Sequence, residues 1–231
     1  VTLYFLLNSK KIMRKLSFKE TEEIPEKVNH GPVILAYASQ SGTASSICNQ
    51  LAEEAEAHGF IPKIVGLEKY KTIDFQKRIV VFIVATHGEG EPTDNSVEFS
   101  KWLMNKDEHP NLNGLKFVVF GLGNSQYEHY NAMGKKVNKY LETLGGERIY
   151  KYGEGDDLGT REIDFADWKT DLWNELSNYC NENPQTYDPS EFTELPKEDE
   201  NVVIKTFIET FDKAIDPFSI TDTSEYELQT Q

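Results

Sequence analysis

The stretch Ile79-Val-Val-Phe-Ile-Val-Ala85 is an unbroken apolar run, and the polar, glycine-containing stretch Thr86–Asn95 follows it at once. A short apolar run that ends at turn residues is typical of a β-strand buried on both faces. Such strands lie in parallel sheets whose two faces are covered by helices. Residues 79–85 therefore predict an α/β fold.

The flanking sequence extends this pattern in both directions. Four further segments indicate strands, with 63–67 the weakest of them: 33–38, 63–67, 117–120 and 148–152. Apolar residues recur at helical spacing in four segments between and after these strands: 44–55, 97–103, 133–144 and 165–179. Gly59 and the pair Gly145-Gly146 stand where the first and third helices should end.

Strands that alternate with helices predict a parallel sheet covered on both faces. The five units fit a flavodoxin-like, doubly wound, five-stranded parallel sheet. In such sheets ligands bind beyond the carboxyl ends of the strands, where the strand order reverses. Three loops of this chain leave strand ends of that kind, and we expect the functional residues there.

Composition excludes some classes of function. The 231 residues include 24 Lys and Arg against 39 Asp and Glu, a formal net charge of -15. A nucleic-acid-binding protein needs a basic face, so we expect no nucleic-acid partner, whereas an acidic protein suits basic protein partners. The two cysteines, Cys48 and Cys180, are far apart and have no metal-binding spacing, which predicts neither a disulfide framework nor a metal site.

Three regions differ in composition. Residues 1–30 form an N-terminal extension in which the apolar run Val1–Leu7 precedes Lys10, Lys11, Arg14 and Lys15. This order is typical of the cytoplasmic end of a membrane anchor, although an amphipathic or disordered tail fits it too. Residues 31–180 form the predicted domain. Residues 181–231 are acidic and contain prolines, which predicts a flexible linker toward a further domain.

The first of the three loops is Ser39-Gln-Ser-Gly-Thr-Ala44, between a predicted strand and a predicted helix. Hydroxyl and backbone N–H groups at a helix N-terminus can bind a phosphate, helped by the helix dipole. No lysine follows the loop, which favours a monophosphate over a triphosphate. An ordinary Ser/Thr helix cap would use the same residue types.

The other two loops carry glycines and aromatic rings. In Ala85–Asn95, Gly88 and Gly90 permit a close backbone approach to a ligand, and His87 could present a flat ring. In Gly121–Asn131, Tyr127 and Tyr130 stand among polar residues rather than in a helical stripe, which suits stacking on a planar ligand. A glycine-rich turn and packing tyrosines are the alternatives. Together, a phosphate cradle and flat rings match FMN, which has one phosphate and one planar ring system.

Four stretches resemble the FMN-binding domain of NADPH–cytochrome P450 reductases, in the diflavin reductase family, over residues 33–180. They are residues 39–44, 85–95, 120–134 and 155–159, of which Tyr127-Glu-His-Tyr-Asn-Ala-Met-Gly134 separates the chain from short bacterial flavodoxins. Gly145–Ile149 is also similar to nitric oxide synthases, so another diflavin reductase stays open. The chain departs from the resemblance at His87, where these reductases usually carry Tyr, and at Leu158, where many carry a third acid.

The resemblance implies the residues that contact FMN, with Tyr127 stacked on the ring and no metal or separate catalytic residue. The phosphate would contact Ser39, Gln40, Ser41, Gly42, Thr43 and Ala44. The ring system would contact Ala85, Thr86, His87, Gly88, Leu122, Gly123, Asn124, Ser125, Gln126, Tyr127, Glu128, His129, Tyr130 and Asn131, with Asp157 nearby.

The resemblance also implies a function. In this family hydride from NADPH reduces FAD, electrons pass to FMN, and FMN hands them singly to cytochrome P450 or other basic haem proteins. We therefore expect an oxidoreductase domain that works with an FAD/NADP reductase domain of the same chain and cannot oxidise NADPH alone. A missing N-terminal segment would anchor it to the cytoplasmic face of the endoplasmic reticulum; a cytoplasmic location is the alternative.

Two other functions stay open, a free-standing flavodoxin and a flavin-free binding module on the same fold. Two acidic clusters flank the predicted flavin edge and would steer basic partners, unless they are merely solvated surface. Their members are Glu89, Glu91, Asp94 and Glu98 in one cluster, and Asp156, Asp157, Glu162, Asp164 and Asp167 in the other.

Overall fold

The computed structural model describes residues 29–105, 107 and 110–184. The predicted N-terminal extension up to residue 28 and the predicted linker from residue 185 lie outside the described residues. None of the helices in the described part of the chain combines the length and the apolar character that crossing a membrane requires.

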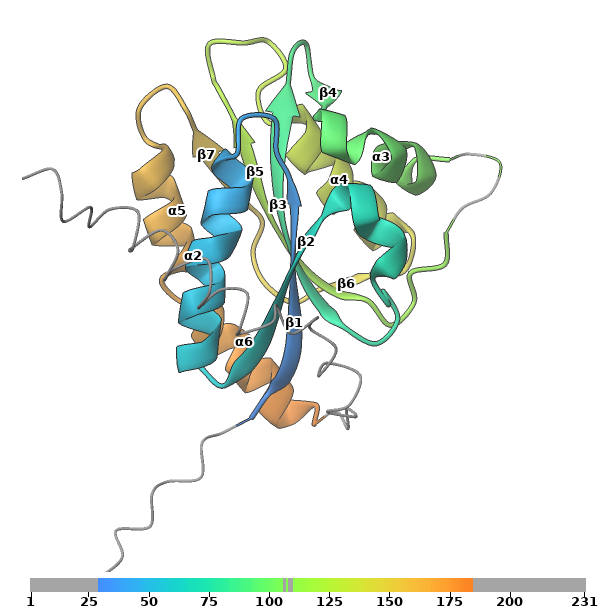
Figure 1. Ribbon diagram of the computed structural model, residues 1–231, viewed down its shortest axis with the longest axis vertical. Coiled ribbons are helices and arrows are strands. Elements are labelled where there is room, and N and C mark those ends of the chain that lie inside the picture. Colours follow the sequence, from blue (N-terminus) through green and yellow to red (C-terminus); the bar gives the residue numbers. More distant parts are fainter. Residues whose placement is uncertain (1–28, 106, 108–109, 185–231) are drawn as a thin grey trace, which may run out of the picture. The chain divides into compact units, whose positions relative to one another are not determined.

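A parallel sheet forms the centre of the domain (Figure 1). Its long strands are β1 (Gly31–Ala38), β2 (Phe60–Gly66), β3 (Ile79–His87) and β5 (Lys116–Gly123). The order β2-β1-β3-β5-β6 is that of a flavodoxin-like sheet, so the predicted α/β, doubly wound fold is confirmed. The order reverses between β1 and β3, which places the expected ligand position at their carboxyl ends.

Two short strands share the fifth position, where the sequence predicted a single strand over residues 148–152. β6 (Glu147–Arg148) pairs with the start of β5, and β7 (Gly153–Asp156) pairs with its end. A regular strand would place Tyr150 and Tyr152 on the same face of the sheet. Instead Tyr150 is buried on one face, with its hydroxyl donating to the Trp168 carbonyl at 2.6 Å, and Tyr152 packs on the other. The broken alternation explains why two short strands occupy the fifth position in place of one continuous strand.

Helices cover both faces of the sheet (Figure 1). One face carries α2 (Thr43–Ala57), α5 (Arg161–Lys169) and α6 (Leu172–Glu182), and the other carries η1 (Leu67–Thr72), α3 (Val97–Leu103) and α4 (Ala132–Thr143). Side chains of each strand alternate between the two cores: Leu35 is buried against the first set of helices and Ala36 against the second. Burial on both faces is what the unbroken apolar runs predicted.

The last predicted helix, over residues 165–179, is two helices in the structure. α5 ends at Lys169 and α6 begins at Leu172. The Thr170 hydroxyl donates to the Ala166 carbonyl at 2.8 Å, a contact by which threonine commonly bends helices. The apolar spacing continues across the bend, because Trp168 and Leu172 are both buried in the same core, so periodicity alone could not reveal it.

A hairpin was not predicted and shapes the second loop. After β3 the chain reverses through residues 87–90 into β4 (Glu91–Pro92), which pairs antiparallel with the end of β3. The short helix η2 (Asp94–Ser96) then leads into α3. The hairpin extends β3 beyond the edge of the main sheet, so His87 lies on a strand rather than in a loose loop.

Candidate functional site

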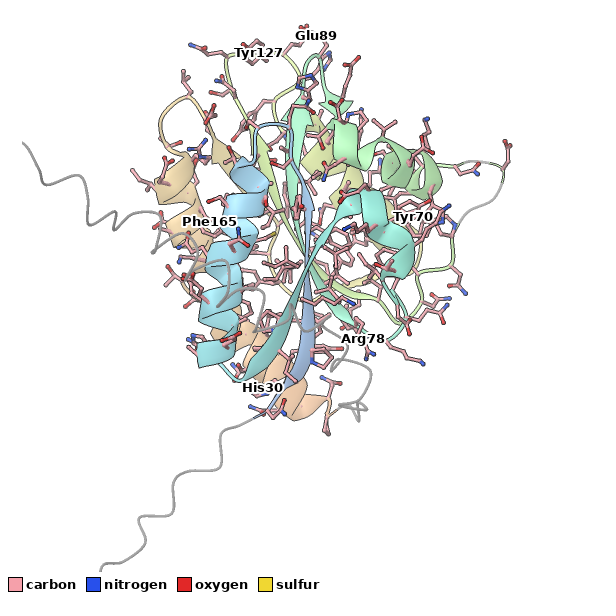
Figure 2. The ribbon with its side chains drawn as sticks, viewed as in Figure 1. His30, Tyr70, Arg78, Glu89, Tyr127 and Phe165 are labelled. Carbon is pink, nitrogen blue, oxygen red and sulfur yellow. The ribbon has the colours of Figure 1, made fainter. Side chains whose placement is uncertain are left out.

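A cavity of about 490 Å³ lies at the carboxyl ends of β1, β3, β5 and β7. This volume is within the range of small-molecule sites, about 300–1,000 Å³. Figure 2 shows Tyr127 and Glu89 at this end of the domain, and His30 and Arg78 at the opposite end. The cavity is lined by Ser39, Gln40, Ser41, Thr43, Ala85, Thr86, His87, Gly88, Glu89, Leu122, Gly123, Asn124, Tyr127, His129, Tyr130, Asn131, Asp157 and Arg161.

Most of the predicted site residues therefore meet around one cavity, although they come from four separate stretches of sequence. The predicted residues that do not line it are Gly42, Ala44, Ser125, Gln126 and Glu128. Ala44 is fully buried beneath the first loop. Two lining residues, Glu89 and Arg161, were not among the predicted ligand contacts. Arg161 stands on a helix outside the quoted loops, and only its spacing of four residues from Asp157 could have indicated it.

The first loop leaves the N-terminus of α2 open toward the cavity. No side chain caps this helix, and its first turn contains no acidic residue. Gly42 precedes the helix with φ 93°, and its N–H donates to Ser39 Oγ at 3.0 Å. The N–H groups of the first helical turn have no acceptor within the helix. An uncapped N-terminus without a nearby acid favours an anionic ligand.

Asn95 holds this loop against the stretch that follows the hairpin. Its Oδ1 accepts hydrogen bonds from the Ser39 N–H at 2.9 Å and from Thr93 Oγ1 at 2.8 Å. Its Nδ2 donates to the Tyr37 carbonyl at 3.2 Å and to Glu68 Oε2 at 3.1 Å. One side chain thus fixes where β1 ends and where the first loop begins, which sets the position of the helix N-terminus before any ligand arrives.

The second loop turns sharply between β3 and β4. The Gly90 N–H donates to the His87 carbonyl at 3.2 Å, and Gly90 has φ 93°, where only glycine is unstrained. A Cβ on Gly90 would lie 2.8 Å from the Cβ of His129. Gly90 therefore allows the second and third loops to touch. The sequence analysis had predicted instead that Gly90 permits close approach to a ligand.

Asn131 of the third loop carries a buried amide. Asn131 adopts φ 53° and lines the cavity, but its side chain is fully buried. Asn131 Oδ1 lies 2.8 Å from where a Cβ on Gly121 would stand. The amide therefore packs beneath the third loop against β5, and only a glycine at position 121 leaves room for it.

Tyr127 and His87 supply exposed rings to the cavity. Tyr127 is 58% exposed although it is a large aromatic residue, and His87 is exposed at the end of β3. Both line the same cavity. Aromatic rings left exposed at a cavity are suited to stacking on a planar ligand.

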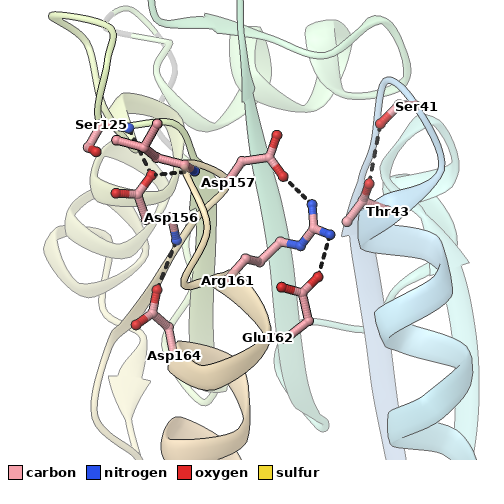
Figure 3. Close-up of polar contacts among 9 residues, drawn as sticks. Ser41, Thr43, Ser125, Asp156, Asp157, Arg161, Glu162 and Asp164 are labelled. Atoms are coloured by element: carbon pink, nitrogen blue, oxygen red, sulfur yellow. Dashed lines mark hydrogen bonds and ion pairs between the residues drawn. The ribbon is translucent and has the colours of Figure 1, made fainter.

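Two carboxylates of the second acidic cluster, Asp156 and Asp164, accept hydrogen bonds from neighbouring parts of the chain (Figure 3). Asp156 Oδ1 accepts from the backbone N–H of Ser125 at 2.9 Å and of Leu158 at 3.0 Å. Asp164 Oδ2 accepts from the Asp156 N–H at 3.0 Å and from Thr160 Oγ1 at 2.8 Å. The bonds from Ser125 lower the pKa of Asp156. These two carboxylates therefore stabilise the loop from β7 to α5 and are not simply solvated charges.

Known proteins share the sequence and the fold of this domain. A sequence model of the flavodoxin family matches residues 35–168. The NADPH–cytochrome P450 reductase of Homo sapiens is 45% identical over 147 residues, which are 61% of this chain and 21% of the relative. That of Candida maltosa is 43% identical over 172 residues, 71% of this chain and 25% of the relative. The chain thus spans about a quarter or less of the length of these relatives.

Solved flavodoxins share the fold at lower identity. A flavodoxin from Streptococcus pneumonia TIGR4 aligns with a TM-score of 0.53 and 22% identity, over 64% of this chain and 99% of the other. A cysteine-to-alanine mutant of flavodoxin from Pseudomonas aeruginosa aligns with a TM-score of 0.52 and 24% identity, over 63% of this chain and 98% of the other. Identities this low indicate the fold alone.

Proposed function

The chain belongs to the flavodoxin family, and we propose that it binds one FMN in the cavity at the carboxyl ends of β1, β3, β5 and β7. One observation carries the proposal: an uncapped helix N-terminus and two exposed aromatic rings line a single cavity. These groups match two parts of FMN, namely its phosphate and its flat ring system.

The residues present divide the binding between them. The N–H groups at the start of α2, with the Ser41 and Thr43 hydroxyls, would hold the phosphate. The third loop, which ends at Asn131, would lie along an edge of the ring system, and Tyr127 and His87 would lie against its faces. The remaining predicted contacts among residues 39–44, 85–88, 122–131 and Asp157 would complete the site. When bound, the flavin supplies one-electron redox chemistry, and the protein supplies binding and electrostatics.

We further propose that the chain is the FMN domain of a diflavin reductase that passes single electrons from FAD to haem proteins. The identity to NADPH–cytochrome P450 reductases supports this reading. The FAD/NADP reductase domain, a cytochrome P450 or other basic haem partner, and anchoring at the cytoplasmic face of the endoplasmic reticulum all belong to this proposal. A free-standing flavodoxin is the alternative function.

Electron delivery can be tested directly. FMN-loaded protein is reduced photochemically and mixed with oxidised cytochrome c, a basic haem protein, in a stopped-flow spectrometer. Reduction of the haem at a rate that rises with cytochrome concentration supports the proposal. A flavin that stays reduced in the presence of cytochrome would contradict the carrier function, while leaving FMN binding itself intact.

A further inference from the structure

Arg161 lines the cavity from the start of α5, outside the three loops described above. Among the described residues that line the cavity, Arg161 is the single lysine or arginine, and the acids Glu89 and Asp157 line it as well. A dianionic phosphate entering this cavity would therefore meet two negative side chains and one positive one. The first loop supplies hydroxyl and N–H groups, but no cation.

Two carboxylates hold the Arg161 guanidinium in place (Figure 3). Nη1 is hydrogen-bonded and ion-paired with Asp157, and Nη2 bonds Glu162 Oε1 at 2.6 Å. The side chain is 29% exposed, although arginine is usually more so at a protein surface. A planar guanidinium anchored at two points has less freedom to lose when a third group binds.

The anchored guanidinium still has donors to spare. Arginine has five N–H donors, and the bonds to Asp157 and Glu162 use one on each terminal nitrogen. Figure 3 shows the guanidinium lying on the side of Asp157 that faces Ser41 and Thr43. Those two hydroxyl residues begin α2 and line the same cavity. Arg161 thus faces the predicted phosphate position across the cavity mouth.

We propose that Arg161 is a phosphate-recognising residue, which makes the site selective for FMN over riboflavin. The proposal rests on the proposed function, since it assumes that a flavin occupies the cavity. Asp157 and Glu162 act as positioning residues that aim the guanidinium at the ligand. A charged hydrogen bond to the phosphate would be formed by FMN and not by riboflavin, which lacks the phosphate.

The test compares the dissociation constants of FMN and riboflavin, measured by quenching of flavin fluorescence. Arg161→Met removes the charge and also leaves Asp157 without a partner, which would repel any anion. The double variant Asp157→Asn/Arg161→Met restores the net charge of the native pair, so it isolates the missing contact. Arg148→Met is the matched control, because Arg148 is ion-paired with Glu142, is 31% exposed, and lies on β6 at the other end of β5.

We expect the ratio of riboflavin to FMN dissociation constants to fall about tenfold in the double variant, and further in Arg161→Met. Arg148→Met should leave the ratio unchanged, and Arg161→Lys should restore part of it. An unchanged ratio in the double variant, or equal weakening of both flavins, would overturn the proposal. Wild-type protein that binds neither flavin would instead refute the proposed function.

Should riboflavin bind too weakly to measure, inorganic phosphate replaces it as the probe. Phosphate should compete with FMN for the wild-type protein and for Arg148→Met. It should compete at several-fold higher concentration for the double variant. Equal competition in all three proteins would overturn the role of Arg161.

Discussion

Gln40 and Asp94 bond each other in both directions across the gap between the first and second loops. Gln40 Nε2 donates to Asp94 Oδ2 at 2.8 Å, and the Asp94 N–H donates to Gln40 Oε1 at 2.9 Å. The side chain of Gln40 therefore lines the cavity while its amide is engaged with the protein. We therefore expect Gln40 to act on ligand binding by fixing the loop, in addition to any direct contact.

Breaking the Gln40–Asp94 pair should make the first loop, residues 39–44, less rigid. Gln40→Ala removes both bonds, and Asp94→Ala removes the bond from Nε2. A typical intramolecular hydrogen bond contributes about 0.5–1.5 kcal/mol. We expect Gln40→Ala to weaken FMN binding about threefold to tenfold, measured by fluorescence titration. The double variant should be no weaker than Gln40→Ala; additive losses would show that the two side chains act independently.

Tyr127 should contribute more than any exposed side chain elsewhere on the domain. Tyr127→Ala removes a ring that is 58% exposed, so the fold should be unaffected while FMN affinity falls about tenfold. Ile163→Ala is the control, since Ile163 is 62% exposed and does not line the cavity. Equal FMN affinity of the Tyr127 variant and wild type would exclude ring stacking at this position.

Substitutions at His87 test what the chain loses by carrying histidine where the similar reductases usually carry tyrosine. Tyrosine presents a larger flat surface than imidazole, so His87→Tyr should strengthen FMN binding by a fewfold, and His87→Ala should weaken it. The dissociation constants of the three proteins provide the comparison. Identical constants would mean that the His87 side chain points away from the ligand, and that the glycine-containing turn alone contacts it.

Glu54 should make stability depend on pH. Burial raises the pKa of the Glu54 carboxyl, but hydrogen bonds from Lys169 and from Trp173 Nε1, at 3.2 Å, outweigh it and hold that pKa below its usual value. A carboxyl with a lowered folded-state pKa stabilises the fold above its unfolded pKa of about 4.3. That contribution is lost as pH falls through the folded value.

Glu54→Gln removes the titrating group from this contact. We expect the variant to be about 1 kcal/mol less stable than wild type at pH 7 in urea unfolding. The difference should shrink as pH falls below about 4. A difference that stays constant down to pH 3 would mean that the Glu54 charge does not matter.

Charge reversal at the hairpin acids tests steering of basic partners without breaking the backbone hydrogen bonds that Asp156 and Asp164 accept. Glu89→Lys/Glu91→Lys should slow reduction of cytochrome c at low ionic strength, and added salt should reduce the difference. Glu53→Lys/Glu56→Lys changes the net charge equally at the far end of α2. If both pairs slow the reaction equally, net charge and not position controls the rate.

The sequence predicted the fold because buried parallel strands are continuous apolar runs, as Ile79–Ala85 shows. It could not predict the division of the fifth strand, because nothing in the sequence indicates that Tyr150 and Tyr152 pack on opposite faces of the sheet. The bend at Thr170 left the apolar spacing intact. Residues 39–44 and 121–131 met at one cavity as expected, because strand ends in a parallel sheet share one edge.

Contacts between side chains of distant segments were harder to predict. Asn95 ties Ser39 to the segment after the hairpin, and nothing in the spacing of the two residues indicates the bond. Asp156 and Asp164 were predicted to steer basic partners, with solvated surface as the alternative, and the hydrogen bonds that they accept within the loop were not predicted. Arg161 was not predicted because it stands at the start of α5, beyond the loop that follows β7.

The most direct test is titration of flavin-free protein with FMN, followed by flavin fluorescence and by the visible absorption spectrum. The account predicts saturable, tight binding of one FMN per chain, with quenched fluorescence as the ring stacks on Tyr127, and a clear loss of affinity in Tyr127→Ala. Absence of saturable binding, with the protein shown to be folded by circular dichroism, would contradict it.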